Sequence, residues 1–180
     1  MKGSLETNYA EALFELCKER ENLDEVHSEM SWLAEVLEKN EELLKFLNAP
    51  TIEAADRKKV LNNVFEGELS KTAFDFLCVA VDNKRIKYMP KIIESFNSLY
   101  NEEKNILEVT AITTIPLSET LREKLIKKLE SVSGNTIVLK EKIDKSIIGG
   151  IVLEYSNTQI QGSVKHKLDE LRERINSVIA

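Results

Sequence analysis

The chain has 180 residues, of which 42% are hydrophobic and 31% are charged, an ordinary composition for a globular protein. Its formal net charge of -6 disfavours a nucleic-acid-binding protein, because such proteins present a basic face. No apolar run reaches the length of about 18 residues that a membrane-spanning helix needs, so we expect no direct membrane insertion. Cys17 and Cys78 lie too far apart for a metal knuckle or a disulfide framework.

The negative charge is concentrated at the start of the chain. Residues 1–50 hold five Lys and Arg against twelve Asp and Glu, and the remaining residues are close to balanced. Two interpretations stay open: a solvated helix surface, or a surface that steers a basic or dipolar partner.

Up to Tyr100, hydrophobic residues recur at steps of three and four, which predicts one helix after another. The predicted helices cover 8–20, 23–40 and 40–48, then one capped by Thr51 and ended by Gly67, one capped by Ser70, and one with Pro90 in its first turn. Six helices with short connections predict an antiparallel bundle over residues 1–105. Trp32 lies off the main apolar stripe of its helix, so it is either a packing residue or an interface anchor.

After Lys104 the hydrophobic period changes from 3.6 to 2, which predicts strands. The expected elements are a strand over 107–115, a helix between Ser118 and Gly134, strands over 136–143, 147–155 and 159–161, and a closing helix over 163–178. Residues 106–180 therefore form a small α+β domain, and the whole chain belongs to the α+β class.

No constellation of residues in the sequence predicts catalysis. His27 and His166 have no second His or Cys at ligand spacing, so we expect no metal site, and His27 is predicted to be a solvated surface residue. The sequence has neither a nucleophile elbow nor a phosphate-binding Gly-rich loop, so no catalytic residue and no cofactor is predicted. A small enzyme that uses His166 with nearby carboxylates is a remote alternative.

Two adjacent glycines interrupt an apolar segment near the end of the chain. Gly149-Gly150 would weaken a strand unless the backbone needs a bulge, a left-handed residue or a close approach, so a structural role and a contact role are both open. Ser156-Asn157 fits a tight turn, and Gly162-Ser163 fits a strand end followed by a helix cap.

Several segments, in order along nearly the whole chain, resemble the delta subunit of the rotary F-type ATP synthase, the OSCP/delta family. These segments are 9–16, 40–47 followed by Pro50, 76–77, 83–85, 142–150 and 162–164. The chain departs from the usual family pattern at Ser156-Asn157, where Gly-Asp is common, and at Gln161, where Asp is common.

The resemblance implies a non-catalytic subunit of the peripheral stalk, present in a single copy per complex and monomeric when isolated. Its N-terminal bundle is expected to bind the N-terminal helix of an alpha subunit. Its C-terminal domain is expected to bind the C-terminal end of the b-subunit dimer. The absence of a transit peptide adds the expectation of a bacterial protein at the cytoplasmic side of the cell membrane. A helical adaptor unrelated to ATP synthesis remains the alternative.

The resemblance also places the contact residues. The family's alpha-binding groove lies between the first and fifth helices, which here gives Tyr9, Ala10, Leu13, Phe14, Phe74, Leu77, Ala80 and Val81. About two thirds of these are expected to face the core, with Tyr9 and Ala80 as the better outward candidates. The b-facing motif corresponds to Asp144, Ile148, Gly149, Gly150, Gly162 and Ser163.

Overall fold

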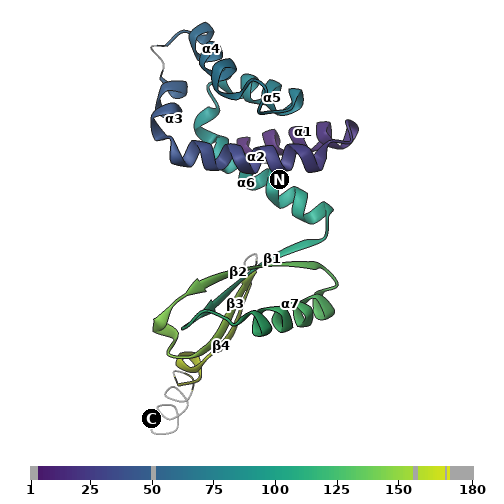
Figure 1. Cartoon of the computed structure of the whole chain (residues 1–180), viewed down its shortest axis with the longest axis vertical. Helices are drawn as coiled ribbons and strands as arrows, with labels where there is room; N and C mark the ends of the chain where they lie inside the picture. The colour runs from purple at the N-terminus through teal and green to yellow at the C-terminus, as the bar shows by residue number, and fades with distance from the viewer. Residues whose placement is uncertain (1–3, 50–51, 156–157, 169, 171–180) are drawn as a thin grey trace. The chain divides into compact units, whose positions relative to one another are not determined.

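The computed structural model describes residues 4–49, 52–155, 158–168 and 170, and the chain divides into two compact units, Met1–Glu103 and Lys104–Ala180 (Figure 1). Helices make up the first unit, and the second combines a four-stranded sheet with helix. The predicted α+β class is therefore confirmed.

The N-terminal unit contains α-helices whose bounds follow the predicted ranges closely. They are α1 (Leu5–Glu19), α2 (Leu23–Lys39), α3 (Glu41–Asn48), α4 (Ala54–Phe65), α5 (Lys71–Asp82) and α6 (Met89–Glu103). A single 3-10 turn, η1 (Ile86–Tyr88), leads into α6, and Pro90 lies in the first turn of α6 as predicted.

A side-chain cap marks the start of α5 but not that of α4. Ser70 accepts a hydrogen bond from the backbone N–H of Ala73 at 3.4 Å and caps α5 as predicted. The predicted cap of α4 is wrong, because α4 begins at Ala54 with Glu53 in the N-cap position and without a side-chain cap bond. Thr51 itself lies outside the described residues.

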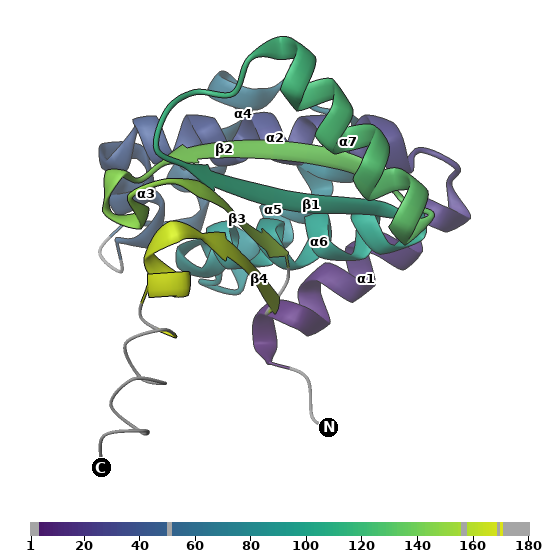
Figure 2. The same ribbon diagram turned by 90° about the horizontal axis from the view of Figure 1, so that it is seen from below.

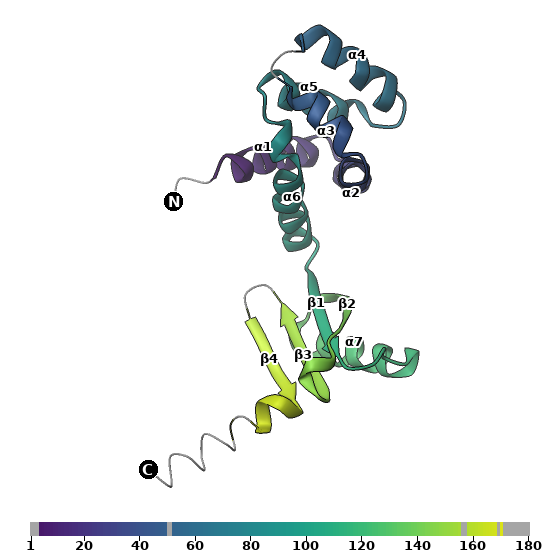
Figure 3. The same cartoon turned by 90° about the vertical axis from the view of Figure 1, so that its left-hand side faces the viewer.

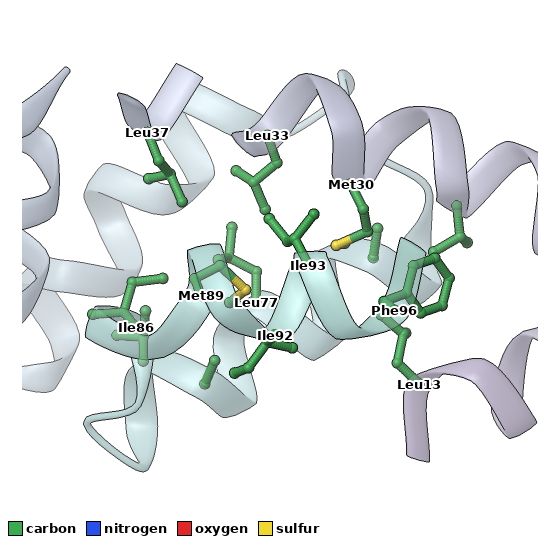
Figure 4. Packing of buried hydrophobic residues seen from close by; sticks show 14 of the residues in the cluster. Leu13, Met30, Leu33, Leu37, Leu77, Ile86, Met89, Ile92, Ile93 and Phe96 are labelled. Atoms are coloured by element: carbon green, nitrogen blue, oxygen red, sulfur yellow. The ribbon is translucent and has the colours of Figure 1, made fainter. Parts of the chain in front are cut away.

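The core of this unit forms around α6, whose buried side chains meet those of its neighbours (Figure 4). Phe96 approaches Leu13 of α1, and Ile93 lies against the α2 side chains Met30 and Leu33. Each fully buried side chain of this size stabilises the fold by roughly 1.5–3 kcal/mol relative to an exposed one. The packing holds α1, α2, α5 and α6 in fixed positions against one another.

The C-terminal unit is a sheet in the order β2-β1-β3-β4, with β4 at one edge (Figure 3). Its strands are β1 (Ile106–Thr113), β2 (Thr136–Ile143), β3 (Gly150–Tyr155) and β4 (Thr158–Ser163), and α7 (Glu119–Ser133) joins β1 to β2. The β1 and β2 strands are parallel, so their connection must cross over the sheet, and α7 makes that crossover. Figure 2 shows α7 lying across this part of the sheet, where it covers Val109, Ile137 and Leu139.

The third strand begins later than the sequence predicts. Lys145–Ile147 forms the 3-10 turn η2, and β3 starts only at Gly150. Asp144 causes this difference, because its side chain accepts a hydrogen bond from the backbone N–H of Ser146 at 2.8 Å and starts the turn. Residues 164–168 and 170 are helical, whereas Ser156-Asn157 and the rest of the predicted closing helix lie outside the described residues.

None of the helices in the described ranges is long and apolar enough to cross a membrane.

Candidate helix-binding groove and C-terminal patch

Helices α1 and α5 border a shared hollow of about 200 Å³, which we call the α1–α5 groove. Its lining residues are Ala12, Leu13, Leu16, Arg20, Thr72, Asp75, Phe76 and Val79. Beside it, the rings of Tyr9 and Phe76 meet edge to face with their centroids 6.2 Å apart. The groove is therefore built from two helices that lie far apart in the sequence.

The groove exposes apolar side chains that are only partly buried or lie outside the core stripe. On α1 the core stripe is formed by Ala10, Leu13 and Cys17. Ala12 and Leu16 lie on another face of this helix and turn toward the groove. On α5, Phe76 is half-buried and Val79 is 49% exposed. This lining suits the apolar face of an amphipathic helix.

A polar contact fixes the two helices at one end of the groove. Arg20 Nη1 and Asn22 Nδ2 both donate to the Thr72 hydroxyl, each at 3.1 Å. Thr72 is buried in the first turn of α5. Its two donors belong to the segment that directly follows α1, so the two hydrogen bonds connect the end of α1 to the start of α5. These bonds hold the width of the groove.

The predicted groove residues divide between the core and partly exposed positions. The fully buried ones are Ala10, Leu13, Leu77, Ala80 and Val81. The half-buried ones are Tyr9, Phe14 and Phe74. An outward role for Ala80 is wrong, because α5 turns Ala73, Leu77 and Ala80 together into the core. Leu13 alone among the eight predicted residues lines the α1–α5 groove.

Sequence reasoning missed four apolar side chains that line the groove, namely Ala12, Leu16, Phe76 and Val79. A signal was present, because Tyr9, Ala12 and Leu16 recur at steps of three and four beside the core stripe of α1. Phe76 and Val79 form a similar pair on α5.

The two other aromatic predictions for this unit have clear outcomes. Trp32 is 39% exposed and meets the ring of Phe65 edge to face at 6.0 Å, so it packs on α4 and also reaches the surface. His27 is not a solvated surface residue as predicted. Its half-buried ring stacks on Tyr100 of α6 with centroids 3.7 Å apart, because α2 packs along α6.

In the C-terminal unit, the motif starting at Asp144 forms a tight turn. The Ser146 hydrogen bonds hold the pKa of Asp144 below its usual value of 3.8, and Lys142 and Lys165 act in the same direction. Ile148 follows the turn with a φ of +67°, which is unusual for a β-branched residue, and its side chain is 63% exposed.

The glycines of this motif have a structural reason. Gly150 has a φ of +83°, and a Cβ atom there would lie 2.2 Å from the Gly162 carbonyl oxygen. A Cβ at Gly162 would lie 2.7 Å from the Ile151 carbonyl oxygen. The close approach of β3 and β4 therefore excludes any side chain at either of these two positions.

Beside the glycines, apolar side chains reach solvent. The Gly149 carbonyl accepts a hydrogen bond from the Val164 N–H at 2.9 Å, which places the start of the last helix next to Ile148. Ser163 is buried and caps that helix by accepting from the His166 N–H at 3.2 Å. Val164 and Leu168 are 42% and 52% exposed, and with Ile148 we call them the C-terminal patch.

The described residues contain no group of three or more His, Cys, Asp and Glu side chains that could hold a metal ion. His166 lies 3.5 Å from Glu170 on the same exposed helix face, as a solvated pair at i and i+4 does. The Cys17 thiol is buried, and this burial raises its pKa from 9.0 to about 11.

Comparisons with known proteins agree over the full length of the chain. The family described as "ATP synthase delta (OSCP) subunit" matches residues 5–175. The ATP synthase subunit delta of Desulfitobacterium hafniense (strain Y51) is 33% identical over 176 residues, covering 98% of both chains. That of Clostridioides difficile (strain 630) is 32% identical over 181 residues, covering 100% of both.

A chain in the cryo-EM structure of the Toxoplasma gondii mitochondrial ATP synthase hexamer has the same fold, with a TM-score of 0.78 at 21% identity, covering 96% of this chain and 98% of that one. Nothing in these comparisons supports an adaptor unrelated to ATP synthesis. The chain belongs to the ATP synthase delta (OSCP) subunit family, and it is a non-catalytic peripheral-stalk component of an F-type ATP synthase.

Proposed function

We propose that the α1–α5 groove receives the amphipathic N-terminal helix of one alpha subunit, while the C-terminal unit binds the C-terminal end of the b-subunit dimer. One chain would then link the catalytic head to the membrane sector as a single-copy stator subunit that is monomeric when isolated. The observation that carries the proposal is the row of exposed apolar side chains between α1 and α5.

An amphipathic helix is a suitable occupant for this groove. Its apolar residues at i, i+3, i+4 and i+7 would cover Ala12, Leu16, Phe76 and Val79. Because α1 and α5, the helices that carry these side chains, are packed into the core, the groove is already formed before the partner binds, and little ordering entropy opposes docking. In this arrangement α1 to α6 would form one antiparallel bundle that holds the groove rigid.

The C-terminal patch is the proposed contact with the b subunits. Ile148, Val164 and Leu168 offer apolar area at the surface, and a strained backbone at Ile148 is a feature that functional sites often retain. Asp144, Gly149, Gly150, Gly162 and Ser163 shape the turn that presents this patch.

A stalk that resists torque needs both contacts in the same molecule. We place this link at the cytoplasmic side of a bacterial cell membrane, in line with the bacterial relatives of the chain.

Titration calorimetry of the full chain with a synthetic alpha N-terminal peptide tests the groove. We expect a 1:1 complex, and we expect Val79→Glu to weaken it at least about ten-fold, because a carboxylate would be desolvated against the apolar face of the peptide. Val64→Glu is the matched control, since Val64 is a 42% exposed helical valine outside the groove. Equal effects of the two substitutions, or no binding at micromolar concentration, would contradict the proposal.

A further inference from the structure

Helix α1 borders a second hollow, on the side that faces α6. Its volume is about 550 Å³, and its lining residues are Glu11, Phe14, Glu15, Lys18, Glu19 and Leu99. We call it the α1–α6 groove. Phe14 and Leu16 project roughly 160° apart around the α1 axis, so the two grooves lie on opposite sides of the same helix. Figure 3 shows α1 and α6 crossing, and the two helices pack closely in the core.

The floor of the α1–α6 groove is apolar and firmly supported. Phe14 and Leu99 are half-buried and pack against the core of the N-terminal unit. The Phe14 ring also meets the buried ring of Phe96 edge to face, with centroids 6.3 Å apart. The floor is therefore a preformed apolar surface that reaches solvent.

The rim of this groove carries an unbalanced row of negative charge. Glu11, Glu15 and Glu19 recur at i, i+4 and i+8 on α1, and all three are exposed. Within the part of the chain that the structure describes, none of them has an ion-pair partner, whereas Glu35 and Glu41 on the next helices pair with lysines at i+4. Like charges at this spacing oppose each other, so the row weakens the isolated helix.

The lysine that lines the α1–α6 groove does not neutralise the row. Lys18 Nζ lies 2.8 Å from a carboxylate oxygen of Glu103 and 5.5 Å from the centroid of the Phe14 ring. Its charge is therefore matched by Glu103 of α6.

We propose that the α1–α6 groove docks a second amphipathic helix, separate from the occupant of the α1–α5 groove, whose apolar face covers Phe14 and Leu99 and whose lysines or arginines pair with Glu11, Glu15 and Glu19. Charge complementarity selects this occupant. Nucleic acids and anionic membranes are negatively charged and would be repelled by the glutamates, and a metal cation would not bind the apolar floor. The helical spacing of the three carboxylates matches basic residues at i, i+4 and i+8 on a helix that lies alongside α1. The bundle would thus hold a partner helix on each side of α1.

The first test titrates the full chain with a designed helical peptide of about 20 residues, which has lysines at i, i+4 and i+8 and leucines at i+3 and i+7. We expect a 1:1 complex that weakens with salt, and amide chemical-shift changes that centre on Glu11 to Glu19 and Leu99. The triple variant E11Q/E15Q/E19Q should bind about ten-fold more weakly. The matched control E38Q/E42Q/E68Q loses the same charge from exposed glutamates outside the groove and should bind within about two-fold of the natural chain.

Equal weakening by both triple variants would mean that the peptide senses only net charge, and it would overturn the proposal. Loss of binding in Val79→Glu would place the peptide in the α1–α5 groove and would overturn it as well. This outcome is independent of whether the alpha peptide binds, so the two proposals can fail separately.

The second test uses the assembled ATP synthase. Carbodiimide coupling should join at least one carboxylate of the row to a lysine of another subunit, and a small amine label should react less with the row in the complex than in the isolated chain. Equal labelling of the row in both states would contradict a docked helix.

Discussion

At the scale of single residues, Ile148 keeps a costly backbone conformation while its side chain is largely exposed to solvent. A positive φ at a β-branched residue costs on the order of 1–3 kcal/mol, and 63% of the Ile148 side chain remains exposed. Glycine would adopt this φ without strain, yet the chain retains isoleucine. A role of this apolar side chain outside the fold would agree with the proposed contact with the b subunits.

Replacing Ile148 separates stability from binding. We expect Ile148→Gly to raise the free energy of unfolding by about 1 kcal/mol, because the strain disappears, and to weaken binding to a C-terminal b fragment. Urea unfolding followed by circular dichroism and surface plasmon resonance measure the two effects. Ile148→Val retains both the strain and the apolar surface and is the control. A glycine variant that is less stable and binds normally would show that the residue serves the fold.

Cys17 gives a pH-dependent prediction. Its pKa in the folded protein is about 11 against 9.0 in an exposed thiol, chiefly because burial disfavours the thiolate. Above pH 9 the unfolded chain loses this proton and the folded chain keeps it, so the free energy of unfolding falls as the pH rises toward 11. The maximum slope from one such group is about 1.4 kcal/mol per pH unit.

The measurement is urea unfolding of the natural chain and Cys17→Ala at several pH values across this window. We expect Cys17→Ala to have a lower free energy of unfolding than the natural chain below pH 9. Between pH 9 and 11 its free energy of unfolding should fall less steeply, because the variant has no thiol at this position to titrate. Parallel pH profiles would show that the thiol is ionised in the folded protein.

At the scale of elements, α1 serves the core and two grooves with three different faces. Ala10, Leu13 and Cys17 pack inward, Ala12 and Leu16 line one groove, and Phe14 with the row of glutamates lines the other. A helix with so many faces in use cannot tolerate a shift along its neighbours, because one residue of slip would misplace all three faces.

The N-cap residue of α5, Ser70, positions this helix. The Ser70 N–H and hydroxyl donate to the two carboxylate oxygens of Glu29 at 2.6 and 2.7 Å, and the Ser70 hydroxyl caps α5. We expect Ser70→Ala to lower the free energy of unfolding by about 1–2 kcal/mol through loss of the cap and of the Glu29 contact.

A double-mutant cycle with Glu29→Gln measures how much of this belongs to the pair, and we expect a coupling of at least about 0.5 kcal/mol. Strict additivity of the two substitutions would mean that the cap acts without Glu29.

How much could be predicted from the sequence differs between elements. Helix and strand ranges followed from hydrophobic period, and Ser70 and Pro90 marked two helix starts correctly. The start of β3 could not be predicted, because the apolar residues around Gly149 are typical of a strand. The hydrogen bond to Asp144, which turns the first of these residues into a 3-10 turn, is a local side-chain contact that the hydrophobic pattern does not reveal.

The α1–α5 groove was harder to predict than the helices that form it. Helix α5 is apolar on several faces, so period alone does not tell which face meets the core and which meets solvent. The elements that pack against α5, mainly α4 and α2, decide this, and in the folded unit Ala80 is buried while Val79 is 49% exposed. Likewise, His27 is covered by Tyr100, a residue far away in the sequence.

In the whole molecule, one chain is proposed to bind two partners, one with each unit. A single-site variant in either unit should therefore break the link between head and membrane sector, even though the other unit still binds. With the proposed single copy per complex, two defective copies with different defects would not replace one intact chain.

Reconstitution of proton-driven ATP synthesis in membranes depleted of this subunit tests whether one chain must bind both partners. The natural chain and Val64→Glu should restore synthesis, whereas Val79→Glu and Ile148→Asn should each fail to do so. An equimolar mixture of Val79→Glu and Ile148→Asn should fail as well, because both intact sites must belong to the same molecule. Recovery of synthesis by the mixture, or by either variant alone, would contradict a single chain that joins the two partners.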